Sequence, residues 1–467
     1  MKKISQSLVL SSFFLLVACS PSNDFETLHV SSDTSEQEKL LALQKIYSVE
    51  TVQTDHVDVQ NSKIEWKRQI YGGLPILNSW IKTVSTEQNK NDLVGAKIVL
   101  TPSGKISKSP LQDQISAESE IYKKIATRLK GFKIESVRTY WLERNKKLIS
   151  VYEVLGISKN HQLMAVHLDT KGLRKVNQTP VGSHFSQLSE NEIVDLKAFV
   201  FPDGPRRSPL TEVELTQVLK GITLNSKKIN VYSSSGENVS IGSNPLHFDV
   251  GDPRFNQVQA FFILQKANDW FEKNLGWTWA GQLAVETEIG YPDQTNAMFY
   301  YQNKIRLGKG DGVLYKNIPQ DPSIVVHEGV HSIVDRIARL PFQGEGGSLN
   351  EAYSDFIAAA YLDRPQIGDA AYLKGQFKRD ISIPKSWSER SGGLYGDSLI
   401  VSSFFWELTQ EIGKDSTLKL AIHTLRKLFP DETLDRFKEK LLASSRQTLN
   451  KEELTKFESL LKTRGWN

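Results

Sequence analysis

Short runs of alternating apolar and polar residues dominate the chain between residues 37 and 180. The run at 64–71 is followed by Gly-Gly at 72–73, and the run at 96–100 is followed by Pro-Ser-Gly at 102–104. These are turn residues, so both runs are predicted to be β-strands. Stretches with helical spacing occur at 37–49 and 115–130. We therefore predict one α+β domain at 37–180, a region of ordinary domain size.

From about residue 245 the spacing of the apolar residues changes. Residues 258–275 have strong amphipathic helical spacing, 283–311 have strand-like spacing with a loop, and the chain after residue 320 is mainly helical in pattern. We expect a β-rich lobe that includes a central helix at 245–340 and a helical lobe at 341–467.

The region between these two parts, residues 181–244, is predicted to be a linker with a processing site. It contains the loop-forming sequence Pro-Asp-Gly-Pro-Arg-Arg, in which Arg206 and Arg207 are the best candidates for a protease nick. The alternative is that this basic pair is only solvated, as basic pairs in loops commonly are.

Composition excludes several classes of function. The 467-residue chain has 39% hydrophobic and 24% charged residues, which is typical of globular proteins. Its net charge of +4 is spread along the chain without a basic block, so we expect no nucleic-acid partner. The single cysteine, Cys19, rules out an intramolecular disulfide bond.

The amino terminus has the pattern of a targeting segment. Lys2 and Lys3 precede a short apolar run at residues 8–17, which is too short for a membrane-spanning helix, and Leu-Val-Ala leads into Cys19. This sequence resembles the lipobox of bacterial lipoproteins. The resemblance implies a signal peptide at 1–18, cleavage before Cys19, and lipid on the sulfur and the new amino group of that residue.

Lipid on Cys19 would give the protein a membrane partner and a place in the bacterial cell envelope. Ser20 after it favours the outer membrane over the inner one. Residues 19–36 are polar, lack helical spacing and are predicted to be a flexible tether. The alternative is an ordinary secretory signal with an incidental cysteine.

The sharpest chemical signal is the string His327-Glu328-Gly329-Val330-His331, which lies among apolar residues with helical spacing. Positions four apart share one helix face, so both imidazoles can point at one metal ion, and Glu328 lies beside them where it can hold the metal's water. The same string also arises by chance as polar positions of a surface helix. A third metal ligand decides between the two interpretations.

Glu351 is the candidate for that third ligand. It lies 20 residues after His331 and opens a second stretch with helical spacing, and Asp355 lies four residues further along the same face. Histidine ligands usually donate their other ring N–H to a carboxylate, and Asp355 suits that role. The sequence therefore predicts one catalytic zinc site with its fourth position left for water.

HEGVH followed at this spacing by NEAYSD resembles the thermolysin family of zinc metallopeptidases over roughly residues 245–467. The resemblance implies three zinc ligands, a general base and a carboxylate that holds a ligand. In this chain those roles fall on His327, His331 and Glu351, on Glu328, and on Asp355. It also implies the fold class, an α+β protein with a β-rich amino-terminal lobe, a zinc-binding central helix and a helical carboxy-terminal lobe.

A second resemblance concerns the amino-terminal half. Residues 64–84 resemble the FTP-type propeptide module that precedes thermolysins, and residues 147–176 resemble the PepSY-type strands that follow it. The resemblance implies that 37–180 is a propeptide region, that the protein is made as a precursor, and that the propeptide is one of its partners. The alternative is another kind of sheet-and-helix domain.

Three further residues are candidates for substrate binding. Asn296 and Ala297 begin a segment that resembles the family's edge strand, whose backbone and asparagine amide hold the substrate main chain. Arg379 resembles the arginine that binds a substrate carbonyl next to the specificity pocket. The alternatives are that Asn296 only caps a turn and that Arg379 only pairs with Asp380.

The chain departs from the family where the family stabilises the oxyanion. Tyr395 occupies the position of its second catalytic histidine, Arg390 that of an orienting aspartate, and Phe342 that of an active-site tyrosine. We predict that Tyr395 is a catalytic residue that donates its hydroxyl to the oxyanion, with Arg390 as a source of charge. The alternative is that Tyr395 belongs to the core. The family's calcium ligands match poorly, with Ser323 in place of an aspartate, so no calcium site is predicted.

The sequence thus predicts a zinc endopeptidase that hydrolyses a peptide or protein substrate, with Glu328 taking the proton of the metal-activated water. The altered Arg390 and Tyr395 positions motivate an alternative, a weak or inactive peptidase-fold envelope protein that binds zinc or peptide. A third and weaker alternative is that the amino-terminal half inhibits another peptidase.

Overall fold

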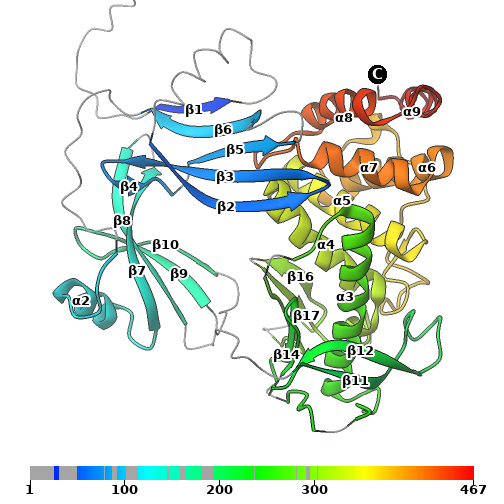
Figure 1. The fold of residues 1–467 in the computed structure, drawn as a ribbon, viewed down its shortest axis with the longest axis horizontal. Coiled ribbons are helices and arrows are strands. Elements are labelled where there is room, and N and C mark those ends of the chain that lie inside the picture. Colours follow the sequence, from blue (N-terminus) through cyan, green and yellow to red (C-terminus); the bar gives the residue numbers. More distant parts are fainter. Residues whose placement is uncertain are drawn as a thin grey trace, which may run out of the picture.

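The computed structural model describes most of the chain, which forms three large β-sheets, a two-stranded sheet and a group of helices (Figure 1). The predicted signal peptide, Cys19 and the helix expected at 37–49 lie outside the described residues. The described residues are 26–30, 50–77, 79–86, 92–100, 114–144, 147–157, 163–180, 193–221, 223–235, 237–242, 244–279, 281–290, 295–301 and 303–466.

The first sheet is antiparallel and has six strands. The strands expected at 64–71 and 96–100 are confirmed. The tether predicted at 19–36 is wrong in part, because residues 26–30 pair with the edge of this sheet, whose unpaired backbone groups accept another strand. The strand order is β1 (Glu26–Val30), β6 (Asp92–Leu100), β5 (Trp80–Ser85), β3 (Ser62–Tyr71) and β2 (Thr51–Val59), with β4 (Leu74–Pro75) beside β3.

The second sheet has its own small core. It is antiparallel, and α2 (Glu120–Arg128) contributes Ile125 to a buried cluster with residues of the sheet such as Val137 and Val154. The helix is shorter than the predicted 115–130 because Ser119 caps it by accepting a hydrogen bond from the Tyr122 N–H. The strand order is β10 (Lys175–Pro180), β9 (Leu163–Asp169), β8 (Lys147–Ile157) and β7 (Lys133–Arg144).

The third sheet corrects our interpretation of residues 181–244 as a linker. Strands between 193 and 233 belong to this seven-stranded sheet, because alternate residues such as Leu196, Ala198 and Leu215 are buried in the main core. The strand order is β11 (Ile193–Val200), β12 (Thr211–Leu219), β13 (Leu224–Asn225), β14 (Ile229–Ser233), β15 (Leu283–Thr287), β17 (Lys304–Leu307) and β16 (Met298–Tyr301).

The Arg206–Arg207 pair is also bound rather than only solvated. The Arg206 guanidinium donates to the carbonyl oxygens of Asp369, Tyr372 and Gln376, and Arg207 Nε donates to Asp369 Oδ2 at 2.5 Å. These contacts hold the 201–208 loop against a segment far along the chain.

Three helices lie at the centre of the carboxy-terminal half: α3 (Pro253–Leu275), α4 (Pro322–Ala338) and α5 (Gly344–Leu362). Asp321 begins α4, since its carboxylate accepts hydrogen bonds from the Ser323 and Ile324 N–H groups. The other elements are η1 (Ile318–Gln320), β18 (Gln366–Ile367), β19 (Arg379–Asp380), η2 (Trp387–Glu389), α6 (Leu394–Ile412), α7 (Lys414–Leu425), α8 (Leu434–Thr448) and α9 (Lys451–Thr463).

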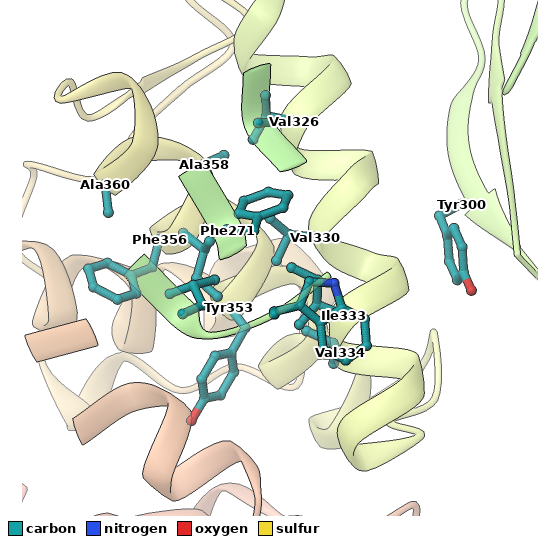
Figure 2. Close-up of a cluster of buried hydrophobic side chains, with 14 of the residues drawn as sticks. Phe271, Tyr300, Val326, Val330, Ile333, Val334, Tyr353, Phe356, Ala358 and Ala360 are labelled. Carbon is teal, nitrogen blue, oxygen red and sulfur yellow. The ribbon is translucent and has the colours of Figure 1, made fainter. Parts of the chain in front are cut away.

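One side of α4 packs into the core against α5. Figure 2 shows Val326, Val330 and Val334 along this side, toward Tyr353 and Phe356 of α5. These valines are four residues apart, which is close to one helical turn and matches the helical spacing in the sequence. This packing fixes the direction of the side chains at the neighbouring positions of α4.

The first sheet docks on the same core. The indole N–H of Trp66 donates to the carbonyl oxygen of Arg336 at the end of α4 (3.3 Å), and the Arg339 guanidinium lies 4.3 Å from the Trp66 ring centre. The buried ammonium of Lys82 donates to the Leu428 carbonyl oxygen at 2.6 Å. The first sheet therefore shares its hydrophobic core with the helices, and β2, β3 and β5 extend toward these helices in Figure 1. The second sheet has a separate hydrophobic core.

The predicted α+β fold class is confirmed, with a β-rich lobe, central helices and a helical lobe preceded by two further sheets. In the described part of the chain, no helix is long and apolar enough to cross a membrane.

Candidate active site

The side of α4 that does not face the core lines a cleft. The residues on this side of α4 also follow the helical spacing, so two histidines four residues apart face the same cleft. Between them, Gly329 lets α4 approach α3, since a Cβ there would lie 3.1 Å from Leu264 Cδ2. The cleft residues of α4 are Ile324, His327, Glu328 and His331.

Three potential metal ligands meet at the centre of the cleft. His327 Nε2 lies 3.1 Å from His331 Nε2 and 3.4 Å from Glu351 Oε2, and His331 Nε2 lies 3.6 Å from Glu351 Oε1. One donor atom from each of the three residues can be chosen so that all lie within 4.8 Å of one another. The structure thus brings together the three residues that the sequence predicted as zinc ligands.

The second ring nitrogen of each histidine lies close to a polar side chain of α5. His327 Nδ1 lies 2.9 Å from Asp355 Oδ1, and Asp355 is fully buried. His331 Nδ1 lies 2.8 Å from Asn350 Oδ1 and 3.0 Å from Ser354 Oγ. These contacts orient both rings, and a proton on Nδ1 leaves Nε2 as the ligand atom.

The charges of the cluster favour a cation. Burial works against the charge on His327, but Asp355 and Glu351 outweigh it and raise its pKa to about 9. Burial also raises the pKa of Glu351, but His327 outweighs it and lowers that pKa to about 2. The pKa of the Asp355 carboxyl is lowered by Arg379 and His327 against the effect of burial. Two carboxylates therefore lie beside the imidazoles and stabilise a positive charge there. A bound metal ion would take the place of the extra proton on His327.

Glu328 lies beside the cluster with one free oxygen. The residue is 4% exposed, and within the described ranges its Oε2 atom is buried without a hydrogen-bond partner. A buried carboxylate oxygen of this kind is unfavourable unless a bound group supplies a hydrogen. A water molecule next to the metal would supply one.

The residues present therefore fit a zinc ion. Two imidazole nitrogens and one carboxylate form a common ligand set of catalytic zinc, and this set leaves a coordination position open. The carboxylate 2.9 Å from His327 Nδ1, the hydrogen-bond partners of His331 Nδ1 and the unpartnered Glu328 oxygen agree with that assignment.

The cleft has a volume of about 380 Å³. The edge strand β16 forms one wall, and α6 with the segment before β19 forms another. Besides the metal cluster and Glu328, its lining residues are Met298, Phe299, Tyr300, Tyr301, Ile324, Phe342, Ile367, Lys378, Arg379, Leu394 and Tyr395.

Arg379 lines the cleft and is bound to Asp355. Its Nε and Nη2 atoms donate to the two carboxylate oxygens of Asp355 at 3.0 and 2.6 Å. Asp380 instead accepts hydrogen bonds from Gln366 and Ser382. The alternative in which Arg379 pairs with Asp380 is therefore wrong, and one carboxylate joins the arginine to His327.

Asn296 and Ala297 do not line the cleft. Both ends of the Asn296 amide bind Asp311: Nδ2 donates to Asp311 Oδ2 at 2.9 Å, and Oδ1 accepts from the Asp311 N–H at 3.0 Å. The Ala297 carbonyl oxygen accepts from the Gly308 N–H at 2.8 Å. The alternative interpretation, in which Asn296 only caps a turn, is therefore the one that the structure supports. The strand that follows this residue, β16, does line the cleft.

Tyr395 belongs to the cleft and not to the core, so its alternative interpretation is wrong. It lies in the first turn of α6, is 50% exposed and has the Arg379 guanidinium 5.2 Å from its ring centre. Asp397 holds the loop before this turn by accepting hydrogen bonds from the Ser391 and Gly392 N–H groups at 2.8 and 3.0 Å.

Arg390 is not a source of charge in the cleft. Its Nη1 atom donates to Asp435 at 2.9 Å, and its guanidinium lies 4.6 Å from the ring centre of Trp387. It does not belong to the cleft lining. This prediction is wrong because the segment before α6 turns the arginine toward α8.

Phe342 does line the cleft, 5.9 Å from His331 and 6.0 Å from Tyr301 between ring centres. It brings no hydroxyl group to this position.

Sequence reasoning missed the partners of His331 and the cleft lysine. Asn350 and Ser354 are four apart in NEAYSD, so the motif itself held a signal for a second pair on one helix face. For Lys378 the apolar and polar pattern held no such signal.

Comparisons with known proteins find distant similarity to bacterial proteases. The chain is 25% identical to a bacillolysin of Brevibacillus brevis over 197 residues, which cover 36% of this chain and 37% of that protein. It is 29% identical to neutral protease B of Bacillus subtilis (strain 168) over 163 residues, with 33% and 30% covered. It is 23% identical to a thermolysin of Bacillus sp. (strain EA1) over 214 residues, with 40% and 39% covered.

The chain is a distant relative of the thermolysins and bacillolysins. It spans less than two fifths of the length of these three relatives. Among solved structures it is similar to the precursor of protealysin, a metalloproteinase from Serratia proteamaculans, with 17% identity, a TM-score of 0.45, and 54% of this chain and 90% of that one covered. No family model matches the chain.

Proposed function

We propose that this thermolysin-like protein is a zinc-dependent endopeptidase. The observation that carries the proposal is the cluster of His327, His331 and Glu351, whose donor atoms lie within 4.8 Å of one another in the lining of a cleft. The relatives named as neutral protease and thermolysin support a peptidase of this kind.

When bound, the zinc ion would polarise the scissile carbonyl and acidify a water molecule. Glu328 would act as general base, because its buried Oε2 atom has no competing hydrogen-bond donor in the described part of the protein. The same carboxyl would then pass the proton to the leaving amine. Asp355 keeps the His327 ring oriented throughout.

The substrate would bind as an extended strand along β16. Among the described strands, β16 pairs with β17 on one side only, so its other edge can accept a peptide backbone. The β16 residues Met298 to Tyr301 all line the cleft. Substrate recognition thus rests on this strand and not on the Asn296 amide.

Tyr395 would donate its hydroxyl to the oxyanion. The residue lines the same cleft as the metal cluster, and its side chain is half exposed to that cleft. Its neighbour Arg379 adds positive charge to that wall.

A second candidate function is a peptidase fold that binds zinc or peptide without turnover. The observation in its favour is that Phe342 and Tyr395 replace the hydroxyl and the imidazole that the family resemblance implies. A Glu328→Gln variant separates the two candidates, since it abolishes hydrolysis only in an enzyme.

We also propose that the protein is a precursor that lipid on Cys19 anchors to the cell envelope, at the outer membrane. The two amino-terminal sheets would serve as a propeptide module, which the docking of Trp66 and Lys82 on the carboxy-terminal core supports. No described residue of these sheets lines the cleft, so the module would act without filling the active site.

The experiment that tests the main proposal uses purified residues 20–467. We expect about one zinc per chain and casein hydrolysis that a chelator stops and added zinc restores. A protein that binds no zinc would overturn the proposal. Zinc without hydrolysis would favour the binding protein.

A further inference from the structure

The cleft contains a second cation besides Arg379. Lys378 lines it together with Ile324 and Ile367. The Lys378 backbone N–H donates to the Ile367 carbonyl oxygen at 2.9 Å, so the pairing of β18 with β19 fixes where the lysine side chain starts. Gly368 leaves room for it, because a Cβ at this position would lie 2.9 Å from Lys378 Cβ.

The ammonium group of Lys378 lies near two tyrosine rings. It is 5.6 Å from the ring centre of Tyr315 and 5.7 Å from that of Tyr395. Such cation–π contacts hold the group in place but leave its N–H donors available for an oxygen ligand.

The two neighbouring cations differ in their partners. Arg379 is held through two hydrogen bonds by Asp355. Lys378, in contrast, is exposed to the cleft, and no carboxylate of the described residues forms a salt bridge with it. The cleft therefore offers one cation whose charge has no anionic partner at contact distance.

A substrate side chain that enters this part of the cleft meets apolar isoleucines and one ammonium group. The carbon atoms of an acidic side chain can pack on Ile324 and Ile367 while its carboxylate accepts from Lys378. An apolar side chain would leave the ammonium desolvated without a partner, and a basic one would be repelled.

We propose that Lys378 makes the cleft select peptide substrates with an aspartate or glutamate next to the scissile bond. The inference rests on the proposed peptidase function and names the substrate class of the same site.

The test begins with cleavage sites in casein, identified by mass spectrometry, and continues with peptide pairs that carry Glu or Gln at the enriched position. We expect wild-type kcat/KM to favour Glu over Gln by about 10-fold to 100-fold, as for a charge-assisted hydrogen bond. The Lys378→Met variant should bring this ratio near unity. Lys378→Arg, which keeps the charge, should retain the preference, and Lys378→Glu should favour a basic residue instead.

Lys374→Met is the matched control, because Lys374 is exposed in the same connection but does not line the cleft. It should keep the wild-type ratio. Equal rates for Glu and Gln in the wild type, or a preference that survives in Lys378→Met, would overturn the inference while casein hydrolysis still supports the peptidase. Absence of casein hydrolysis by the zinc-loaded wild type would overturn the proposed function itself.

Discussion

The α4–α5 side of the cleft and its α6 wall differ in how firmly their polar groups are held. On the α4–α5 wall, Asp355 is fully buried and forms close ion-pair contacts with His327 and Arg379, at 2.9 and 2.6 Å. On the α6 wall, Tyr395 is half exposed, and its ring contacts the cations of Lys378 and Arg379. The first wall is a connected network and the second is a single side chain.

This difference follows from what each wall would have to do. A metal site needs several donor atoms held in one geometry by a supporting layer of hydrogen bonds. An oxyanion needs a polar hydrogen aimed into the cleft, which different residue types can supply. The chemistry of the α6 wall can therefore change while the metal-binding wall stays intact.

The largest effect is expected from removing a ligand on the metal-binding wall. His331→Ala should lose zinc and reduce casein hydrolysis by more than about 100-fold, because two ligands hold the ion poorly. Metal analysis and a casein assay on the same sample check this. His423→Ala is the control, since His423 of α7 contacts Gln447 of α8 and Arg426 and does not line the cleft. Full zinc content in His331→Ala would show that the ligand assignment is wrong.

On the α6 wall, Tyr395→Phe should lower kcat by about 100-fold to 1000-fold, the usual effect of losing an oxyanion donor. Zinc content and KM should stay near the wild-type values, because the ring that packs beside Arg379 remains. Steady-state kinetics on one peptide measure both constants. An unchanged kcat would mean that the α6 wall contributes no hydroxyl to the reaction.

Asp355→Asn tests the carboxylate that contacts the metal ligand His327. The variant keeps the volume of the buried side chain but removes the charge shared by His327 and Arg379, so zinc affinity should fall about 10-fold to 100-fold. Competition with a chromogenic chelator gives the affinity. An affinity equal to wild type would mean that this carboxylate does not support the metal site.

The smallest effect is expected from Arg390→Ala. The Arg390–Asp435 ion pair is solvent exposed and lies outside the cleft, so hydrolysis should stay within about twofold of wild type and stability should change by about 1 kcal/mol or less. A casein assay and a thermal melt are sufficient. A loss of hydrolysis as large as that of Tyr395→Phe would mean that Arg390 does contribute to catalysis.

The sequence predicted the metal-binding wall well because its geometry is local. The four-residue spacing of His327 and His331 fixes their shared helix face, and Glu351 and Asp355 share a face of the next helix in the same way. That the two helices would meet was an inference from the family resemblance. Their contact depends on buried residues such as Val330 and Tyr353.

The missed features depend on contacts between distant segments. Lys378 reaches the cleft because β19 pairs with β18, and Asn296 is turned away by Asp311, 15 residues later. The loop-forming sequence at 202–207 predicts a linker at 181–244, whereas β14 of this region pairs with β15, which follows it only after the whole of α3. Pattern within a short window cannot specify such pairings.

Zinc content and casein hydrolysis of the Glu328→Gln variant, measured beside the wild type, test the central claim most directly. The substitution keeps the size of the side chain but leaves an amide that accepts no proton, and Glu328 is not one of the three clustered ligands. The account predicts about one zinc per chain in both proteins and hydrolysis in the wild type alone. Equal hydrolysis in both proteins, or zinc in neither, would contradict it.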